Sequence, residues 1–443
     1  LSHDERIFVK NQYIEDNESL TKLCLQLAKA EVLAIDTEFV RTRTLYPRLG
    51  LLQVCDGETV TLIDPIAIDD LSPFWQLLTN PNIEKVLHAC SEDLEVFLTQ
   101  ANCRPINLID SQVMMSFLGH GLSLGYAATV KHYLDIELDK SDSRTDWIKR
   151  PLTASQIQYA GADVEFLYIL FPLLKKDLKQ TSWFEAAQQE TEMMIEKKFT
   201  PIDDSILYQN VKMSWRLNAK QLNSLKFLTQ WRFQQARKRD LPISFVAKDQ
   251  TLMGIAQTLP NNVGTMANIE GVDVLDVRHK GKAMIAVLKQ AEQVEESQYP
   301  EKIKRLDEYP GYKQTFKNIK TFITKIANEH EQAIENFASK KQINQFLTWH
   351  YQLSISQVSA DKIDVLTGWR SSLFGERLLS LSKDNFPVML LVSSIMSKKD
   401  AINFLSRISL SVNKLLTGIE NFKPSYASAI VAPLLVLKSI LVN

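Results

Sequence analysis

Cysteine is scarce in this sequence, and the spacing of the cysteines indicates neither a metal site nor a set of disulfides. The 443 residues include four cysteines, all within the first quarter of the chain, and no Cys-x-x-Cys pair. Zinc sites of the paired-cysteine type are therefore not indicated. So few cysteines in so long a chain also argue against a disulfide framework. We expect Cys24, Cys55, Cys90 and Cys103 to be buried thiols in a reducing cytoplasm.

Charge of one sign and long hydrophobic runs are missing as well. The formal net charge is −1, so the overall balance does not by itself indicate a nucleic-acid partner. Residues 1–20 carry seven charged side chains and no apolar core, which argues against a secretory signal. The apolar stretch at residues 427–442 is interrupted by Pro433 and Lys438 and is shorter than the roughly 20 residues of a membrane-spanning helix. We therefore expect no membrane span.

What is present is the composition of a globular protein, with 45% hydrophobic and 23% charged residues. At about 150 residues per domain, the length predicts roughly three domains. One region departs from the even charge balance, because residues 214–245 contain seven basic side chains and one acid, Asp240. A local basic cluster of this kind is a candidate contact for a phosphate backbone, although a solvated helix face is an equally ordinary interpretation.

Residues 1–205 are predicted to form an α/β domain in which helices cover a mixed sheet. The strand-like runs cover residues 31–35, 51–54, 59–63, 85–89 and 106–109. Asp56 and Gly57 form a turn signal between two of these runs, so we expect the first three to make an antiparallel meander. Helices are expected at residues 71–78, from Ser91 and at 110–118, and a capping box of Thr153 and Gln156 starts a further long helix.

The remaining chain is predicted to be helical, in two units and a tail. The units are expected at residues 210–295 and 298–382, with a polar linker around residues 297–310 and a weak repeat of about 90 residues. Ser339 and Gln342 form a second capping box. The tail, residues 383–443, has one apolar helical face. We interpret it as docking or self-associating helices, with a membrane-surface contact or an artefact of the sequence as alternatives.

Four acids and a tyrosine carry the chemistry. Asp36 and Glu38 stand two apart on a predicted strand, so their side chains point to the same face. Asp93 and Asp163 follow on predicted helices, and Tyr159 lies one helical turn before Asp163. Carboxylates are the ligands of hard cations such as Mg²⁺, and two such ions together cleave phosphodiesters. Taken singly, each acid could be a solvent-facing strand end or helix terminus, but their order and context favour a metal site.

The sequence around these residues resembles the motifs of the ribonuclease D family of exonucleases, whose motifs contain four acids and a tyrosine. The matching segments are residues 36–39, 46–54, 87–95 and 146–153, followed by Tyr159 and Asp163. The resemblance implies a ribonuclease H-like fold and Mg²⁺-dependent removal of mononucleotides from 3′ ends. One departure is Cys90, where the family pattern has glycine, and we expect it to affect packing more than chemistry.

The resemblance also implies roles for individual residues. Asp36, Glu38, Asp93 and Asp163 would bind two metal ions, with Mn²⁺ as a possible substitute for Mg²⁺, and Tyr159 would orient the attacking water. Because a phenol has a reference pKa of about 10, we expect orientation rather than proton abstraction from it. The candidates for contact with the terminal nucleotide are Thr37, Phe39, Gln53 and His88.

Both helical units resemble HRDC domains, the modules that follow the nuclease in ribonuclease D. The similar segments are residues 217–222, 231–237, 309–313, 342–347 and 368–370. The predicted RNA-binding residues of the first unit are Arg216, Lys220, Arg232, Arg237 and Arg239.

We therefore expect a cytoplasmic, monomeric exoribonuclease that trims RNA 3′ ends, with tRNA precursors as the substrate implied by the family. A DNA-directed 3′-5′ exonuclease and an inactive RNA-binding scaffold are the alternatives. Clustered, mutually repelling acids argue against the scaffold, which would have no use for them.

Overall fold

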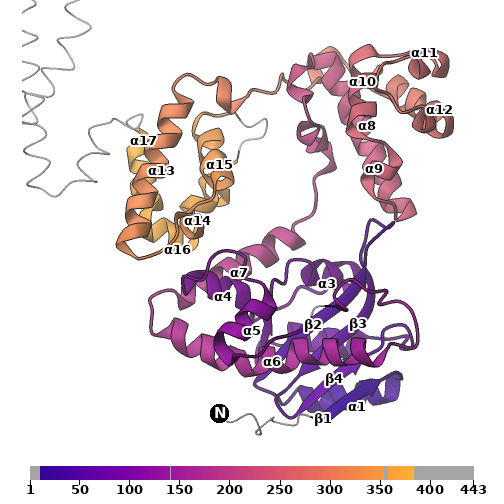
Figure 1. Cartoon of the computed structure of the whole chain (residues 1–443). Helices are drawn as coiled ribbons and strands as arrows, with labels where there is room; N and C mark the ends of the chain where they lie inside the picture. The colour runs from indigo at the N-terminus through magenta and orange to yellow at the C-terminus, as the bar shows by residue number, and fades with distance from the viewer. Residues whose placement is uncertain (1–9, 140, 354–357, 384–443) are drawn as a thin grey trace, which may run out of the picture.

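The computed structural model describes residues 10–139, 141–353 and 358–383. These residues form a sheet-containing unit, called the exonuclease unit after the activity that the sequence predicts, followed by two helical units (Figure 1). Most of the predicted tail at residues 383–443, and with it the prediction that the tail mediates self-association, lies outside the described residues. The predicted class, a mixed α/β domain followed by helical domains, is confirmed.

The exonuclease unit is built on a six-stranded mixed sheet with the order β1-β4-β3-β2-β5-β6. The strands are β1 Lys10–Ile14, β2 Val32–Val40, β3 Arg48–Cys55, β4 Thr59–Ile63, β5 Glu84–Leu87 and β6 Leu108–Asp110. β2, β3 and β4 pair antiparallel, as the predicted meander requires, whereas β1, β5 and β6 join in parallel. The edge strand β1 was not predicted from the sequence.

Helices cover both faces of this sheet, and the alternation of side chains along β2 shows why. Ala34 points into a core that includes the helices α4, α5 and α6, whereas Leu33 and Ile35 point into a second core on the opposite face. The helices of this unit are α1 Asn17–Leu27, α2 Ser72–Thr79, α3 Asp93–Ala101, α4 Ser111–Phe117, α5 Tyr126–Leu134, α6 Ala154–Lys179 and α7 Phe184–Phe199.

Helix α6 is the long helix that positions the site. It starts at the predicted capping box, in which the Thr153 hydroxyl accepts from the Gln156 backbone N–H and the Gln156 side chain accepts from the Thr153 backbone N–H. Among the described residues, α6 is also the one helix long and apolar enough to cross a membrane. It runs across the sheet instead, with Ala160, Val164 and Leu167 buried in the core, so it serves as a core helix (Figure 1).

The two helical units have separate hydrophobic interiors. The first unit contains α8 Ala219–Arg239, α9 Ile243–Val246, α10 Asp249–Thr258, α11 Val263–Ala267 and α12 Val274–Ala291. The second contains α13 Tyr312–Glu329, α14 Ile334–Phe337, α15 Lys340–His350, α16 Gly368–Arg370 and α17 Glu376–Lys383. Short 3₁₀ or π turns at residues 204–210, 214–216, 296–298, 306–308, 360–362, 364–366 and 371–375 connect or extend these helices.

The second helical unit is fused to the exonuclease unit by a buried contact. The Arg370 guanidinium pairs with Glu190 of α7 and donates to the carbonyls of Asn336 and Phe337. The Asn336 amide donates in turn to the carbonyl of Ser116, at 2.8 Å. Aromatic rings of both units pack around this contact, so one continuous core crosses the boundary.

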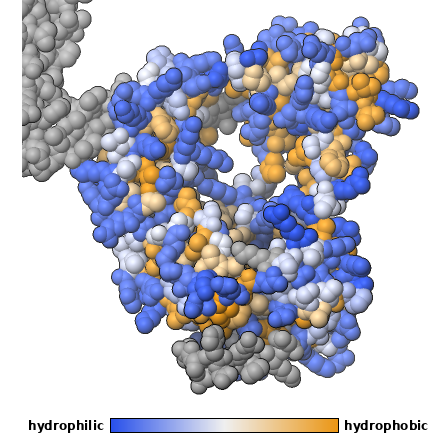
Figure 2. Space-filling view, viewed as in Figure 1, coloured by the Kyte–Doolittle hydropathy of each residue, from blue (hydrophilic) through white to orange (hydrophobic). Residues whose placement is uncertain are grey.

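The first helical unit meets the exonuclease unit through a smaller, polar contact. Asp240 follows α8 in a left-handed conformation, and its carboxylate accepts the backbone N–H groups of Leu45 and Tyr46, each at 3.0 Å. Leu45 and Tyr46 belong to the connection between β2 and β3. Between this contact and the one at Arg370, the space-filling view shows an opening bounded by the three units (Figure 2).

Candidate active site

Three carboxylates from two elements converge above the sheet. Asp36 and Glu38 lie on β2, and Asp163 lies in the third turn of α6, which crosses that strand. One oxygen of each lies within 4.8 Å of an oxygen of the others. The period of two along β2 puts the first two acids on one face, as predicted, and α6 brings the third to them.

The fourth predicted acid, Asp93, lies beside this group. Asp93 begins α3, and its carboxylate accepts a hydrogen bond of 2.5 Å from the Thr37 hydroxyl. Thr37 lies between Asp36 and Glu38 on β2, so this bond ties α3 to the strand that carries them. The charge of Asp93 is close enough to raise the pKa of both Asp36 and Glu38. All four predicted acids therefore lie in one region.

Burial and mutual repulsion disfavour full ionisation of the four acids. Burial, and then the charges of Asp163 and Asp93, raises the pKa of Glu38 to about 9. Burial raises the pKa of Asp163 to about 7 and that of Asp93 to about 6, the latter against the lowering effect of the Thr37 hydroxyl. Burial and the three neighbouring acids also raise the pKa of Asp36 well above its ordinary value.

Tyr159 stands one turn before Asp163 on α6, as predicted. Its hydroxyl is directed at the Asp163 carboxylate, and burial followed by the neighbouring acids raises its pKa above the ordinary value. The phenol therefore stays protonated at neutral pH, and a protonated phenol can donate a hydrogen bond but cannot accept a proton as a base. Its ring packs against Trp147, with the ring centres 6.1 Å apart.

The segment before α6 is fastened to the sheet by Arg150. Its guanidinium makes two hydrogen bonds of 2.6 Å to Asp64, which follows β4, and a third to the carbonyl of Gly50 in β3. A side chain at Gly50 would collide with Trp147, because a Cβ there would lie 2.6 Å from the Trp147 carbonyl oxygen. A glycine at this position thus lets the segment leading to Tyr159 lie directly on the strand.

Three residues that organise the site were missed by the sequence reasoning. Asp110 is buried, and its carboxylate accepts the backbone N–H groups of Ala89 and Cys90, which fixes the connection leading to Asp93. Its place between a strand and a helix signals a helix cap, but not this second role. Arg150 and Tyr126 are the others; Tyr126 donates to the carbonyl of Ala162, and no sequence signal identifies it.

The residues predicted to contact the terminal nucleotide have different surroundings. Thr37 is buried and bonded to Asp93, and Gln53 is fully buried. Phe39 is half-buried on β2. Both ring nitrogens of His88 are engaged within the protein, with the Ser111 hydroxyl and the Leu124 carbonyl. Of these residues, Phe39 retains both an apolar ring and partial exposure.

The predicted RNA-binding residues of the first helical unit also separate into two groups. Arg216, Lys220, Arg237 and Arg239 are exposed. Arg232 is buried, and its guanidinium bonds to Asp249 and to the carbonyl of Ala247. Arg232 therefore supports the packing of its own unit and offers little surface to a phosphate.

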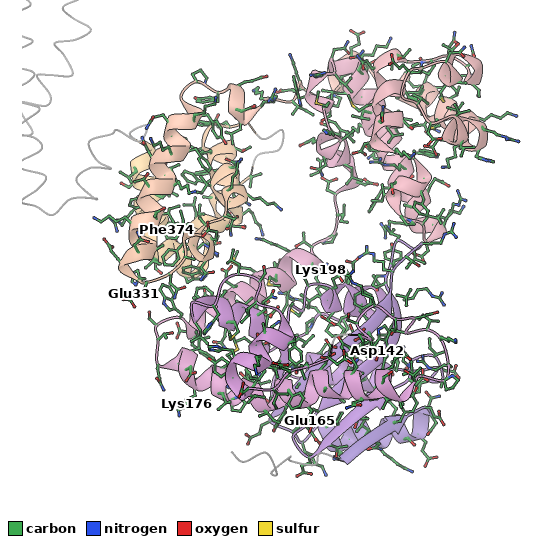
Figure 3. The ribbon with its side chains drawn as sticks, in the orientation of Figure 1. Asp142, Glu165, Lys176, Lys198, Glu331 and Phe374 are labelled. Carbon is green, nitrogen blue, oxygen red and sulfur yellow. The ribbon has the colours of Figure 1, made fainter. Side chains whose placement is uncertain are left out.

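Further cations lie near the acids on the exonuclease unit. Arg41, three residues beyond Glu38, pairs with Glu95 at 2.9 Å, and Lys198 pairs with the same acid at 3.2 Å. Figure 3 labels Lys198 at the end of α7, on the side of the exonuclease unit that faces the opening. Arg41 also lines a cavity of about 480 Å³ between the β2–β3 connection and the first helical unit, together with Lys248.

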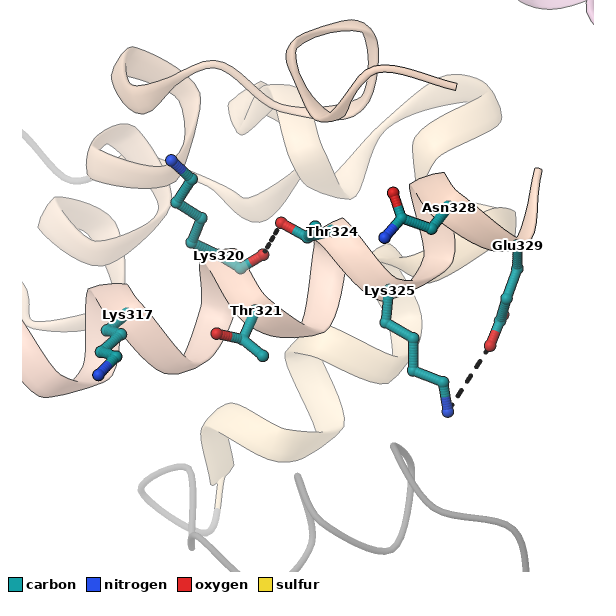
Figure 4. Close-up of a pocket in the computed structure, with 7 residues that line it drawn as sticks. All are labelled: Lys317, Lys320, Thr321, Thr324, Lys325, Asn328 and Glu329. Carbon is teal, nitrogen blue, oxygen red and sulfur yellow. Dashed lines mark hydrogen bonds and ion pairs between the residues drawn. The ribbon is translucent and has the colours of Figure 1, made fainter. Parts of the chain in front are cut away.

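A larger cavity, of about 570 Å³, lies along α13 of the second helical unit (Figure 4). Its lining includes one carboxylate, Glu329, which pairs with Lys325. A single paired acid does not make a multi-carboxylate metal site, so the chemistry belongs to the acids on β2 and α6.

The donor set on β2 and α6 fits divalent cations. Oxygen ligands suit Mg²⁺, Mn²⁺ and Ca²⁺, whereas zinc and copper sites use histidine or cysteine. Acids whose mutual repulsion raises their pKa are stabilised by a cation, because its charge offsets that repulsion.

Comparisons with known proteins agree with this geometry. A family profile described as 3′-5′ exonuclease matches residues 11–179, an HRDC profile matches residues 221–288, and a profile for the C-terminal HRDC domain of ribonuclease D matches residues 310–378. Such an exonuclease domain implies the use of divalent metal ions.

Whole-chain similarity extends over all three units. Ribonuclease D of Cronobacter turicensis is 40% identical over 368 residues, covering 83% of this chain and 99% of the relative. Ribonuclease D of Escherichia coli K12 is 38% identical over 373 residues, covering 84% and 98%. The crystal structure of Escherichia coli RNase D, an exoribonuclease, superposes with a TM-score of 0.81 at 37% identity, covering 85% of this chain and 99% of that one. The chain therefore belongs to the ribonuclease D family and is a 3′-5′ exoribonuclease.

Proposed function

We propose that this exoribonuclease hydrolyses RNA from its 3′ end with two Mg²⁺ ions and releases 5′-mononucleotides, and that its substrates include the 3′ ends of tRNA precursors. The observation that carries the proposal is the convergence of Asp36, Glu38 and Asp163 within 4.8 Å, with Asp93 alongside. Mn²⁺ is expected to substitute for Mg²⁺, since both are bound by carboxylates.

The chain's own residues set the geometry of the reaction. Asp36, Glu38, Asp93 and Asp163 would hold the two cations. Cations held there would supply the charge that activates a water for in-line attack and stabilises the leaving oxygen. Tyr159, whose hydroxyl is directed at the Asp163 carboxylate, would orient the attacking water by a hydrogen bond. It is not the base, because its pKa is raised by burial and by the acids around it.

The path of the RNA is proposed from the exposed cations. Arg237 and Arg239 end α8, next to the Asp240 carboxylate that binds the β2–β3 connection. Arg216 and Lys220 are exposed at the opposite end of α8, near the start of the same unit. Phosphates lying along these side chains would lead the 3′ end towards β2, where the ring of Phe39 can stack on a base. We further propose that the enzyme acts as a cytoplasmic monomer.

The experiment that tests the proposal uses 5′-labelled RNA whose 3′ end is either free or blocked, with and without Mg²⁺. We expect a ladder of labelled products that shorten by one nucleotide, only from the free end and only with the metal. Internal cleavage, equal loss of the blocked RNA, or turnover in EDTA would refute it. A DNA strand of the same sequence, degraded as fast as the RNA, would favour the DNA-directed alternative.

A further inference from the structure

The side chain of Gln53 is the most unusual polar group near the acids. It is fully buried, and neither its Nε2 nor its Oε1 atom has a hydrogen-bond partner among the described residues. A carboxamide offers two donor hydrogens and two acceptor lone pairs. Buried polar groups in native proteins are almost always paired, so an orphaned carboxamide calls for an explanation.

The position of Gln53 supplies that explanation. In the pairing of β2 with β3, Gln53 lies directly opposite Asp36, and directly opposed residues project to the same face of a sheet. Leu51 and Cys55, two residues to either side, share a core with Ala160 and Val164 of α6. The carboxamide therefore lies between the sheet and α6, on the face where Asp36 and Asp163 converge. The Cβ atoms of opposed residues stand about 4.5–5.5 Å apart, within reach of a long side chain or of one intervening water.

Direct contact with the RNA is not open to Gln53, because its side chain has no exposed surface. Its surroundings instead favour action through a neighbouring carboxylate. Asp36, directly opposite Gln53, has a carboxylate oxygen within 4.8 Å of oxygens of Glu38 and Asp163. A neutral donor beside this acid would stabilise its charged form without adding another charge.

We propose that Gln53 is a positioning residue for metal binding. Its Nε2 group reaches the Asp36 carboxylate through one intervening water, and this contact would leave the other oxygen of Asp36 turned towards the cation. Carboxylates that bind metals are themselves held by hydrogen bonds, and loss of such a partner weakens metal affinity by roughly 10–100-fold. The inference rests on the proposed function in one respect, since it requires that Asp36 binds a divalent cation.

Thr61 provides a matched control within the same sheet. Its hydroxyl is also buried and has no hydrogen-bond partner among the described residues. Thr61 lies on the neighbouring strand β4 and pairs with Val54, which belongs to the core on the other side of the sheet. Removing this hydroxyl therefore deletes the same kind of orphaned polar atom from the face away from the acids.

The test compares the full chain with Gln53→Met and Thr61→Val, in the absence of RNA. Mn²⁺ affinity is measured by calorimetric titration, and thermal unfolding is measured in EDTA. Methionine has nearly the volume of glutamine and no hydrogen-bonding amide. We expect Gln53→Met to weaken Mn²⁺ binding about tenfold without lowering the melting temperature, because an orphaned polar group is replaced by an apolar one of similar shape. Thr61→Val should leave the affinity unchanged.

The outcomes separate this inference from the proposed function. Equal Mn²⁺ affinity in the wild type and Gln53→Met would refute the role of Gln53 while leaving the metal site in place. No Mn²⁺ binding by the wild type would refute the proposed metal site itself. If Gln53→Met does not fold, the crystal structure of the wild type with Mn²⁺ tests the role of Gln53 instead. Nε2 within hydrogen-bond distance of Asp36, or of a water bonded to it, supports the inference, and a Gln53 amide without that contact overturns it.

Discussion

Asp36 differs from an ordinary surface aspartate because its own strand and two helices, α3 and α6, place three other acids near it. Burial and these neighbours raise the pKa of the cluster, so the folded protein binds more protons there than the unfolded chain does. The free energy of unfolding should then fall as the pH rises from the pKa that each group has in the unfolded chain to its pKa in the folded protein. The window runs from 4.5 to about 9 for Glu38 and from 3.8 to about 7 for Asp163.

Asp36→Asn should consequently have opposite effects on activity and stability. Nucleotide release should fall by more than the roughly 100-fold that loss of an indirect metal partner costs, because a metal ligand is lost. In EDTA at pH 8 the melting temperature of the exonuclease unit should rise by a few degrees, since relief of about 1 kcal/mol shifts it by roughly 2–4 °C in a unit of about 150–250 residues. At pH 5 the difference should shrink. The exposed Asp69→Asn serves as the control, and a variant that melts below it at pH 8 would contradict the explanation.

Tyr159→Phe removes one hydroxyl and keeps the ring against Trp147. If the hydroxyl orients the attacking water, kcat should fall by about 10²-fold, the effect of a small misplacement of reacting groups. RNA affinity, measured in Ca²⁺ by fluorescence anisotropy, should not change. Tyr168→Phe, on the same helix but against Gly57, should behave as the wild type. An unaltered kcat, or a loss confined to RNA affinity, would rule out the assigned role.

At the scale of single residues, the sequence predicted what depends on local periodicity. The shared face of Asp36 and Glu38 follows from strand geometry, and the pairing of Tyr159 with Asp163 follows from one helical turn. The bond from Thr37 to Asp93 spans 56 positions, and no local pattern encodes it. The burial of Arg232 was likewise not predicted from the sequence, because a basic residue on a helix is most often exposed.

At the scale of elements, the site depends on how α6 is anchored before its first turn. The Arg150 guanidinium donates two hydrogen bonds to the Asp64 carboxylate, and the Asp64 side chain is only 4% exposed. Asp64 also accepts from the Tyr13 hydroxyl on β1. An edge strand, a central hairpin and the start of α6 are thus joined at one carboxylate.

Asp64→Asn should loosen this anchor. It leaves Arg150 without its ionic partner, and a loss of about 3 kcal/mol is expected, the lower end for a buried pair because Arg150 remains partly exposed. Urea unfolding measures this loss, and kcat should fall as well because Tyr159 sits on the same helix. Glu18→Gln, in the exposed pair with Lys22, should cost under about 0.5 kcal/mol. Equal stability of the two variants would show that the pair does not anchor α6.

The elements themselves were predicted where the local signal was strong. Both capping boxes, at Thr153 and Ser339, are present as expected. β2 carries Asp36 and Glu38 as predicted and runs on to Val40, beyond the apolar run at residues 31–35, because β3 still pairs with it at Phe39 and Val40. β1 was missed because a short edge strand with one parallel partner carries little periodic signal.

At the scale of the whole molecule, two unequal contacts attach the helical units. The second unit shares a core and a buried Arg370–Glu190 pair with the exonuclease unit. The first is held at the β2–β3 connection by the single carboxylate of Asp240. The smaller contact lies next to the exposed cations at the end of α8, so the position of those cations depends on it.

Asp240→Ala should release the first unit without unfolding it. The backbone N–H groups of Leu45 and Tyr46 lose their acceptor, at a cost of about 1–2 kcal/mol to the contact. We expect a larger radius of gyration by small-angle X-ray scattering and weaker binding of long RNA. Gln234→Ala, at an exposed and uncharged position of the same helix, is the control. A scattering curve identical to the wild type would mean that Asp240 does not hold the unit.

These contacts between units were not predictable, because each depends on which surfaces meet after every unit has folded. Asp240 was noticed in the sequence as the one acid in a basic segment, but its partners lie 194 and 195 positions away. Arg370 and Glu190 are separated by 180 positions. The sequence could indicate three units and their order, whereas their arrangement required the structure.

The central claim is that the acids on β2, α3 and α6 together hold two divalent cations. Anomalous diffraction from a crystal of the full chain soaked in Mn²⁺ and a non-hydrolysable RNA end tests it most directly. The account predicts two peaks, bound by oxygens of Asp36, Glu38, Asp93 and Asp163. Peaks elsewhere, or no density among these four side chains, would contradict it.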